Sequence, residues 1–162
     1  MVEGGCLCGA IRIKSTGQAI HKALCHCLDC RKITGSTYST NLVVPTATFT
    51  LTKGTPKEYH HTADSGNTVI LSFCGDCGST LWSRSATFGD TTVIKAGTLD
   101  EEEMVEGDHH DGGGQQQRQG RLLLLEEEAR PLLELFVRGR PSWVAAVKGA
   151  VQDEDGAAQK GA

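Results

Sequence analysis

The spacing of the cysteines is the feature that most constrains how this chain can fold. All seven lie in three short groups, a Cys-x-Cys pair, a Cys-x-Cys-x-x-Cys triplet and a Cys-x-x-Cys pair. Thiols this close in sequence do not form a disulfide framework between distant loops, and their number is odd. In a reducing compartment such groups more often bind metal. The groups are Cys6 and Cys8, then Cys25, Cys27 and Cys30, then Cys74 and Cys77.

The ligand number of zinc favours a division of the seven thiols into four and three. Structural zinc takes four ligands in a tetrahedron, and each pair supplies two of them. In an extended Cys-x-Cys both sulfurs point the same way and Leu7 points away. The glycines of the Cys-x-x-Cys segment permit the tight turn that holds two thiolates. We predict a structural zinc site at Cys6, Cys8, Cys74 and Cys77, and a second zinc site at Cys25, Cys27 and Cys30.

Two alternatives to this division remain open from the residues alone. One thiol of a pair could complete the triplet and leave its neighbour unpaired, or the triplet could be a buried cluster of reduced thiols without metal. His26 is disfavoured as a fourth ligand because alternation turns a residue between two ligands away from their metal. The remaining histidines are possible ligands, each disfavoured singly: His21, His60, His61, His109 and His110.

A zinc ion with three protein ligands is typical of catalytic sites, where the fourth position takes water or substrate. Three thiolates leave the ion with a net charge of about −1, which suits a soft ligand better than hydroxide. A thiol that binds there loses its proton and becomes a nucleophile, so attack on a small carbonyl, or its reverse, is favoured. Arg31 and Lys32 are candidate contacts for a carboxylate of that thiol. No catalytic residue is predicted, because no His–carboxylate set stands near the triplet in the sequence.

Short alternating runs rich in Val, Ile, Thr and aromatic residues predict a mainly β domain. Helix signals are sparse, with one turn at 29–32 and a short acidic stretch at 99–104. The segment LLELFVRGRP predicts a last strand that ends at Pro141. The other predicted strands cover residues 10–14, 38–44, 48–52, 68–73, 79–84 and 91–97.

The length of 162 residues suits a single domain, which we place at residues 1–152. Residues 105–121 contain a glycine triplet and a glutamine triplet with almost no apolar groups, so they cannot bury enough surface to offset their ordering entropy. Together with the leucine run that follows, they predict a flexible insertion at about 105–130. The polar residues 153–162 predict a disordered tail.

The charge balance argues against nucleic acid as a partner. Sixteen basic and twenty acidic side chains give a formal net charge of −4, and aromatic residues make up 5% of the chain. Neither a broad basic surface nor many stacking platforms is expected. The N-terminus lacks the pattern of a signal peptide, and no segment approaches the roughly 18 apolar residues of a membrane span. We therefore expect a cytoplasmic protein without membrane or nucleic-acid partners, and we make no prediction of its oligomeric state.

Five segments of the chain resemble the family of glutathione-dependent formaldehyde-activating enzymes, which includes centromere protein V. The segments occur in the family's order, and all seven cysteines match. They are GGCLCGAIRI (4–13), CHCLDCRKITGS (25–36), FCGDCGSTLW (73–82), IKAGTLD (94–100) and ELFVRGRPSWVAAVKGA (134–150). One departure is the connection at 104–131, which is short in the family and long here.

The resemblance implies a β-tent, in which several curled antiparallel sheets and few short helices surround two zinc sites. It places the structural zinc on the same four cysteines and the second zinc on the same three. It also implies a carbon–sulfur lyase that acts on the adduct of a glutathione-type thiol with formaldehyde or another small carbonyl, with that thiol as partner. A non-catalytic, zinc-stabilised binding or scaffold protein of the same fold is the alternative.

Overall fold

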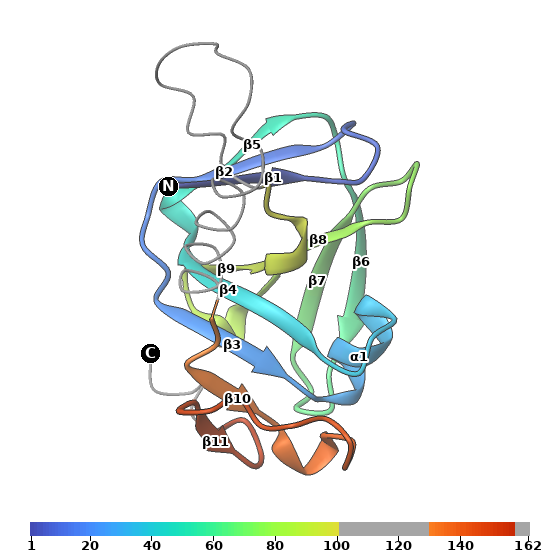
Figure 1. Cartoon of the computed structure of the whole chain (residues 1–162). Helices are drawn as coiled ribbons and strands as arrows, with labels where there is room; N and C mark the ends of the chain where they lie inside the picture. Colours follow the sequence, from blue (N-terminus) through green and yellow to red (C-terminus); the bar gives the residue numbers. More distant parts are fainter. Residues whose placement is uncertain (101–129, 158–162) are drawn as a thin grey trace, which may run out of the picture.

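The computed structural model describes residues 1–100 and 130–157, which form a mainly β fold of two sheets (Figure 1). The smaller sheet has the order β1-β2-β5, and the larger has the order β11-β10-β3-β4-β9-β8-β7-β6. The strands are β1 (Val2–Gly5), β2 (Arg12–Ser15), β3 (His21–Cys25), β4 (Ser39–Pro45), β5 (Phe49–Lys53), β6 (Lys57–Thr62), β7 (Thr68–Phe73), β8 (Thr80–Ser85), β9 (Thr91–Lys95), β10 (Leu133–Leu135) and β11 (Val151–Asp153).

Helical structure is limited to one α-helix and four short 3-10 helices in the described part of the chain. The helix α1 (Leu28–Thr34) begins after Cys27, whose Sγ accepts a hydrogen bond from the Cys30 N–H at 3.3 Å. It ends at Gly35, whose φ of 63° is a left-handed conformation that favours glycine. The prediction of few short helices is confirmed. The 3-10 helices are η1 (Thr46–Thr48), η2 (Ala86–Phe88), η3 (Ala96–Thr98) and η4 (Val137–Gly139).

Between the strands that the structure describes, pairing is antiparallel except at β10, which runs parallel to both of its neighbours, β3 and β11. The largely antiparallel fold that the sequence predicts is confirmed, and β10 adds two parallel pairs to it. A parallel pair needs a long connection, and residues 136–150 supply one between β10 and β11. β10 ends at Leu135, before the predicted end at Pro141, because Phe136 takes a left-handed φ of 56° that stops the extended chain.

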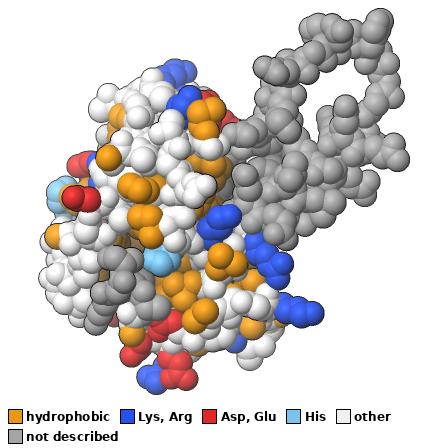
Figure 2. All heavy atoms as spheres, turned by 90° about the vertical axis from the view of Figure 1, so that its left-hand side faces the viewer, with side chains coloured by type: hydrophobic (Ala, Val, Ile, Leu, Met, Phe, Trp, Pro, Cys, Tyr) orange, Lys and Arg blue, Asp and Glu red, His pale blue; other side chains and the backbone are white. Residues whose placement is uncertain are grey.

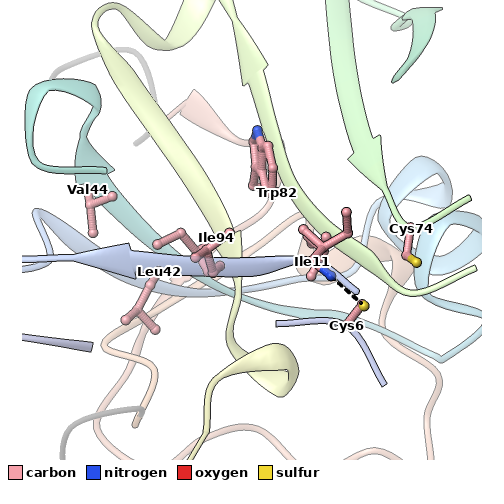
Figure 3. Packing of buried hydrophobic residues seen from close by; sticks show 9 residues of the cluster. Cys6, Ile11, Leu42, Val44, Cys74, Trp82 and Ile94 are labelled. Carbon is pink, nitrogen blue, oxygen red and sulfur yellow. Dashed lines mark hydrogen bonds between the residues drawn. The ribbon is translucent and has the colours of Figure 1, made fainter. Parts of the chain in front are cut away.

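The main hydrophobic core joins the two sheets. Ile13 of β2 and Ile11, which directly precedes β2, come from the side of the smaller sheet. Trp82 and Ile94 come from neighbouring strands of the larger sheet (Figure 3). Two cysteines belong to this core, so one cysteine group lies against its edge. The buried members are Cys6, Ile11, Ile13, Leu42, Val44, Cys74, Leu81, Trp82 and Ile94.

The surface carries charges of both signs. On the face shown in Figure 2, acidic and basic side chains both occur, with hydrophobic side chains between them. No helix of the described residues is both long and apolar enough to span a bilayer. The predicted insertion at 105–130 lies outside the described residues except for Arg130, as do residues 158–162 of the predicted tail. Asp153 ends β11, and its Oδ1 accepts a hydrogen bond from the Gly156 N–H at 3.0 Å.

Candidate functional site

Four thiols lie together in loops that follow β1 and β7, one strand from each sheet. The Sγ atoms of Cys6 and Cys8 are 3.5 Å apart, and those of Cys8 and Cys74 are 3.7 Å apart. A disulfide would bring two sulfurs to about 2.05 Å. Zinc with tetrahedral bonds of about 2.3 Å holds its sulfurs roughly 3.8 Å apart. This four-thiol group (Cys6, Cys8, Cys74 and Cys77) has all its Sγ atoms within 4.8 Å of one another and could hold a metal ion, and its donor set fits zinc.

A tight turn, and not an extended strand, brings Cys6 and Cys8 together. The Gly9 N–H donates to the Cys6 carbonyl at 3.0 Å, and Gly9 has a φ of 71°. The Ile11 N–H then donates to the Cys6 Sγ at 3.2 Å (Figure 3). Leu7, at the tip of the turn, is 90% exposed. Leu7 therefore points away from the sulfurs, as predicted. A tight turn orients it, and not the extended backbone on which the prediction was based.

Hydrogen bonds within the four-thiol group pull the pKa values of its members apart. The side chain and the backbone N–H of Ser79 lower the pKa of Cys77 to about 5. The Ala10 N–H acts to lower the pKa of Cys8, but the neighbouring Cys6 and Cys77 thiols outweigh it and raise that pKa to about 12. Thiols this close cannot all ionise unless a cation lies between them. A bound metal ion would remove this conflict.

The other three thiols meet where β3 passes into α1. Cys25 is the last residue of β3, Cys27 caps the helix, and Cys30 lies in its first turn. Their Sγ atoms lie within 4.8 Å of one another, so this three-thiol group could also hold a metal ion. Cys25 is buried, whereas Cys27 and Cys30 are half-buried. Within residues 1–100 and 130–157, no histidine, carboxylate or further cysteine joins these three as a potential ligand.

The histidines of the described residues have other neighbours. The Nε2 atom of His26 lies 3.2 Å from Glu134, and that of His61 lies 3.0 Å from Asp29 on α1. The Nε2 atom of His60 lies 3.8 Å from Glu58. None of these histidines, nor His21, belongs to either thiol group. His109 and His110 lie outside the described residues.

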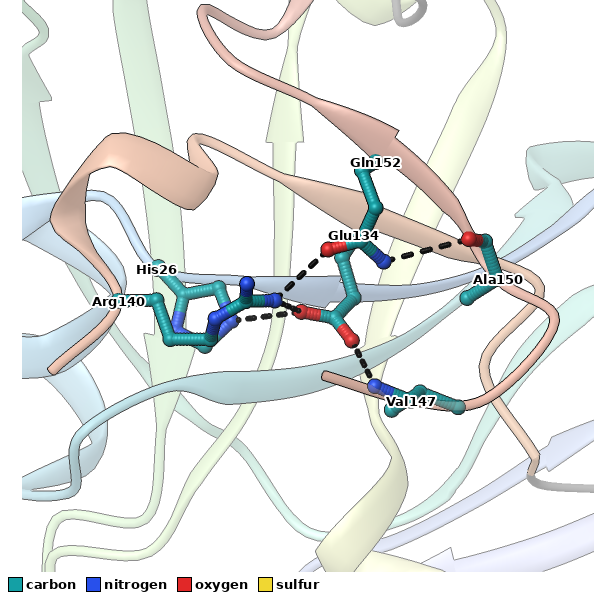
Figure 4. Close-up of polar contacts among 6 residues, drawn as sticks. All are labelled: His26, Glu134, Arg140, Val147, Ala150 and Gln152. Atoms are coloured by element: carbon teal, nitrogen blue, oxygen red, sulfur yellow. Dashed lines mark hydrogen bonds and ion pairs between the residues drawn. The ribbon is translucent and has the colours of Figure 1, made fainter. Parts of the chain in front are cut away.

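A His–carboxylate pair that no sequence pattern indicated lies beside the three-thiol group. Glu134 of β10 is 1% exposed and lies against His26, which stands between Cys25 and Cys27 (Figure 4). Its carboxylate also accepts hydrogen bonds from Arg140, at 2.7 Å, and from the Val147 N–H. The two partners are 108 residues apart in sequence, so only the parallel pairing of β10 with β3 brings them together.

Glu134 is held in its ionised form. Burial alone would raise its pKa, but the hydrogen bonds from the Val147 N–H, Arg140 and His26 outweigh burial and keep the pKa below its ordinary value of 4.5. A carboxyl group whose pKa is lowered on folding stabilises the fold above its unfolded pKa. That contribution is lost as the pH falls through the lower, folded pKa.

We expect the stability advantage of the wild type over Glu134→Gln to decrease as the pH falls. The wild type should be the more stable above about pH 5, and its advantage should shrink as the pH falls below 4.5. Denaturant unfolding of both proteins from pH 7 to pH 3.5 measures the difference. A difference that stays constant across this range would contradict the role of the ionised carboxylate.

The basic residues near the three-thiol group are of two kinds. Arg31 and Lys32, predicted as substrate contacts, lie in the last turn of α1 directly after Cys30, and Lys32 is exposed. Their role stays a prediction. Lys95, which no metal-ligand or charge pattern marks out in the sequence, is buried, and its positive charge acts on Cys30. Its only sequence signal was its place inside the segment IKAGTLD.

Comparisons with known proteins place the chain in a family. The family model described as glutathione-dependent formaldehyde-activating enzyme matches residues 1–111, which contain all seven cysteines. No curated protein matches. The crystal structure of a Rhodobacter sphaeroides protein is similar, with a TM-score of 0.50 and 18% identity over 64% of this chain and 90% of that chain, which is a likeness of fold. The chain belongs to the glutathione-dependent formaldehyde-activating enzyme family.

Proposed function

We propose that this protein is a zinc-dependent enzyme that makes or breaks the carbon–sulfur bond between a glutathione-type thiol and formaldehyde or another small carbonyl. The observation that carries the proposal is the three-thiol group, which gathers one ligand atom fewer than the four-thiol group. Structural zinc sites use four protein ligands, whereas catalytic sites use three and keep one for substrate. Membership of the family supports the substrate class.

The two thiol groups have different tasks in this proposal. The four-thiol group holds a structural zinc that joins the loops after β1 and β7. The three-thiol group holds a second zinc, which when bound lowers the pKa of a thiol substrate so that it binds as thiolate, the nucleophilic form of sulfur. Cys27 and Cys30 are half-buried, so this group can be reached from solvent. Arg31 and Lys32, which follow Cys30 on α1, are our proposed contacts for a carboxylate of the substrate.

The reaction needs no redox partner. In the direction of adduct formation the thiolate sulfur attacks the carbonyl carbon, its electron pair forms the carbon–sulfur bond, and the carbonyl oxygen takes up a proton. The reverse reaction breaks that bond and returns the thiol and the carbonyl compound. The substrate is a small thiol, and no nucleic-acid or membrane partner is required. Seven cysteines that must stay reduced favour a reducing compartment, such as the cytoplasm.

NMR exchange spectroscopy of an equilibrium mixture of glutathione, formaldehyde and their adduct tests the proposal. The zinc-loaded protein should accelerate exchange between the free and the adduct signals. Cys27→Ala should abolish the acceleration, because it removes a ligand of the three-thiol group, while circular dichroism shows that the fold persists. Glu154→Ala, an exposed change, should keep the acceleration and serves as the control.

Two results would contradict the proposal. If the wild type leaves the exchange rate unchanged, the enzyme does not act on this adduct. If Cys27→Ala accelerates exchange as the wild type does, the three-thiol group is not the reaction site. A fourth protein ligand in the coordination sphere of the second metal would favour the scaffold alternative, in which both zinc sites are structural.

A further inference from the structure

A buried lysine lies on the same face of the larger sheet as the three-thiol group. In the strand register, Cys25 is opposite Ser39, and Asn41 is opposite Lys95. Residues directly opposite each other share a face, and so do two residues that are two apart on one strand, such as Ser39 and Asn41. Cys25 and Lys95 therefore flank β4 on one face. The strands that carry them are two spacings apart, roughly 10 Å, which a lysine side chain can largely cross.

The ammonium group of Lys95 is buried with a neutral partner. Lys95 is 6% exposed, and its Nζ donates to the Asn41 Oδ1 at 3.0 Å. The same Oδ1 accepts a hydrogen bond from the Ser39 Oγ at 2.8 Å, which holds Asn41 in place. Among the residues that the structure describes, no carboxylate lies within 4.0 Å of this Nζ. A buried charge without an opposite charge is costly, so a negative group is expected beside it.

The three-thiol group supplies negative charge close to Lys95. The positive charge of Lys95 acts electrostatically on Cys30 of this group. The ammonium group is thus near enough to stabilise negative charge on sulfur at this site.

We propose that Lys95 is the residue that makes the three-thiol site select a thiolate as its fourth ligand. Three thiolates leave zinc with a net charge of about −1, and a fourth would bring it to about −2. The ammonium group offsets the added charge, so an anionic sulfur can bind where a neutral ligand would otherwise be preferred. The incoming thiol releases its proton to solvent and keeps its sulfur electron pair. This inference rests on the proposed function, because it assumes that a thiol binds at this group.

Thiol binding to the cobalt(II)-loaded full chain tests the inference without measuring turnover. Cobalt occupies thiolate sites, and a further sulfur ligand changes its charge-transfer absorption. The protein is titrated with glutathione and, separately, with 2-mercaptoethanol, which has no carboxylate. Lys95→Met should bind both thiols about tenfold or more weakly and keep two metal ions per chain. Lys148→Met, which removes an exposed lysine, should bind both as the wild type does.

A second variant keeps Lys95 in place and neutralises its charge. Asn41→Asp puts a carboxylate where the ammonium group now meets an amide, 3.0 Å away, so it should weaken both thiols as Lys95→Met does. Unchanged affinities in folded variants would overturn the inference alone. A loss of affinity for glutathione alone would also overturn it, because Lys95 would then contact a carboxylate of glutathione. Loss of one metal ion from Lys95→Met would overturn it as well. No spectral change in the wild type would overturn the inference and the proposed function together.

Discussion

Replacing Cys74 with serine should unfold the protein, whereas replacing Cys25 with serine should leave it folded. Both side chains are buried, at 1% and 3% exposure, so the two substitutions change a buried sulfur to oxygen in similar surroundings. They differ in the metal site they damage. Cys74 belongs to the four-thiol group, which links loops from the two sheets at the edge of the main core. Cys25 belongs to the three-thiol group, which lies at one end of β3.

The expected size of the first effect comes from the metal. Structural zinc contributes about 10 kcal/mol or more in small zinc domains. The unfolding free energy of a whole domain is about 5–15 kcal/mol, so the loss of a structural zinc from the four-thiol group would be enough to unfold the chain. A metal ion at the three-thiol group would lie between the end of β3 and α1 and would not join the two sheets, so its loss should cost much less.

Native mass spectrometry and circular dichroism check both statements. The wild type should carry two metal ions per chain, and Cys25→Ser should carry one and keep its β-sheet spectrum. Cys74→Ser should lose that spectrum at room temperature even with zinc in excess. Equal unfolding by the two variants would contradict the division of labour between the thiol groups, and so would a folded Cys74→Ser protein.

The cysteine groups could be predicted from the sequence because ligand spacing is a local property. A pair or triplet of thiols within six residues can meet at one ion whatever the rest of the chain does, and the rule of four ligands then sorts the groups. The predicted mainly β fold has a similar basis, since alternation of apolar residues is read over short windows. The helical turn predicted at 29–32 lies inside α1 (Leu28–Thr34), although Cys27 and not Asp29 caps this helix.

The partners of the three-thiol group could not be predicted in this way because they come from distant strands. Glu134 reaches His26 only through the parallel pairing of β10 with β3, which no local pattern indicates. Lys95 approaches the site through two strand registers, each of which depends on tertiary packing. The turn at Cys6–Gly9 shows the same limit on a small scale, because a Cys-x-Cys segment gives no sign of whether its backbone is extended or turned.

Replacing Glu134 with alanine should destabilise the folded protein by about 3 kcal/mol. Removing one partner from a buried charged network typically costs 3–5 kcal/mol, and the lower value applies here because the side chain of Arg140 is 23% exposed and can be partly rehydrated. His26, at 1% exposure, cannot be rehydrated in the same way. The N–H of Val147 also loses its acceptor, so three donors are left without the carboxylate.

The damage should reach the three-thiol group, since His26 stands between Cys25 and Cys27. Glu134→Ala should therefore lower the affinity of the second metal as well as the unfolding free energy, which denaturant melts and competition with a zinc chelator measure separately. Glu154→Ala removes an ion pair of similar chemistry from the surface, where it meets Arg138 at 2.5 Å, and should change neither quantity appreciably. If Glu134→Ala destabilises the fold but leaves the second metal as tightly bound as in the wild type, the contacts of Glu134 stabilise the position of β10 and have no effect on the metal site. If the unfolding free energy and the metal affinity both fall, the contact of Glu134 with His26 helps to hold the ligands of the three-thiol group in place.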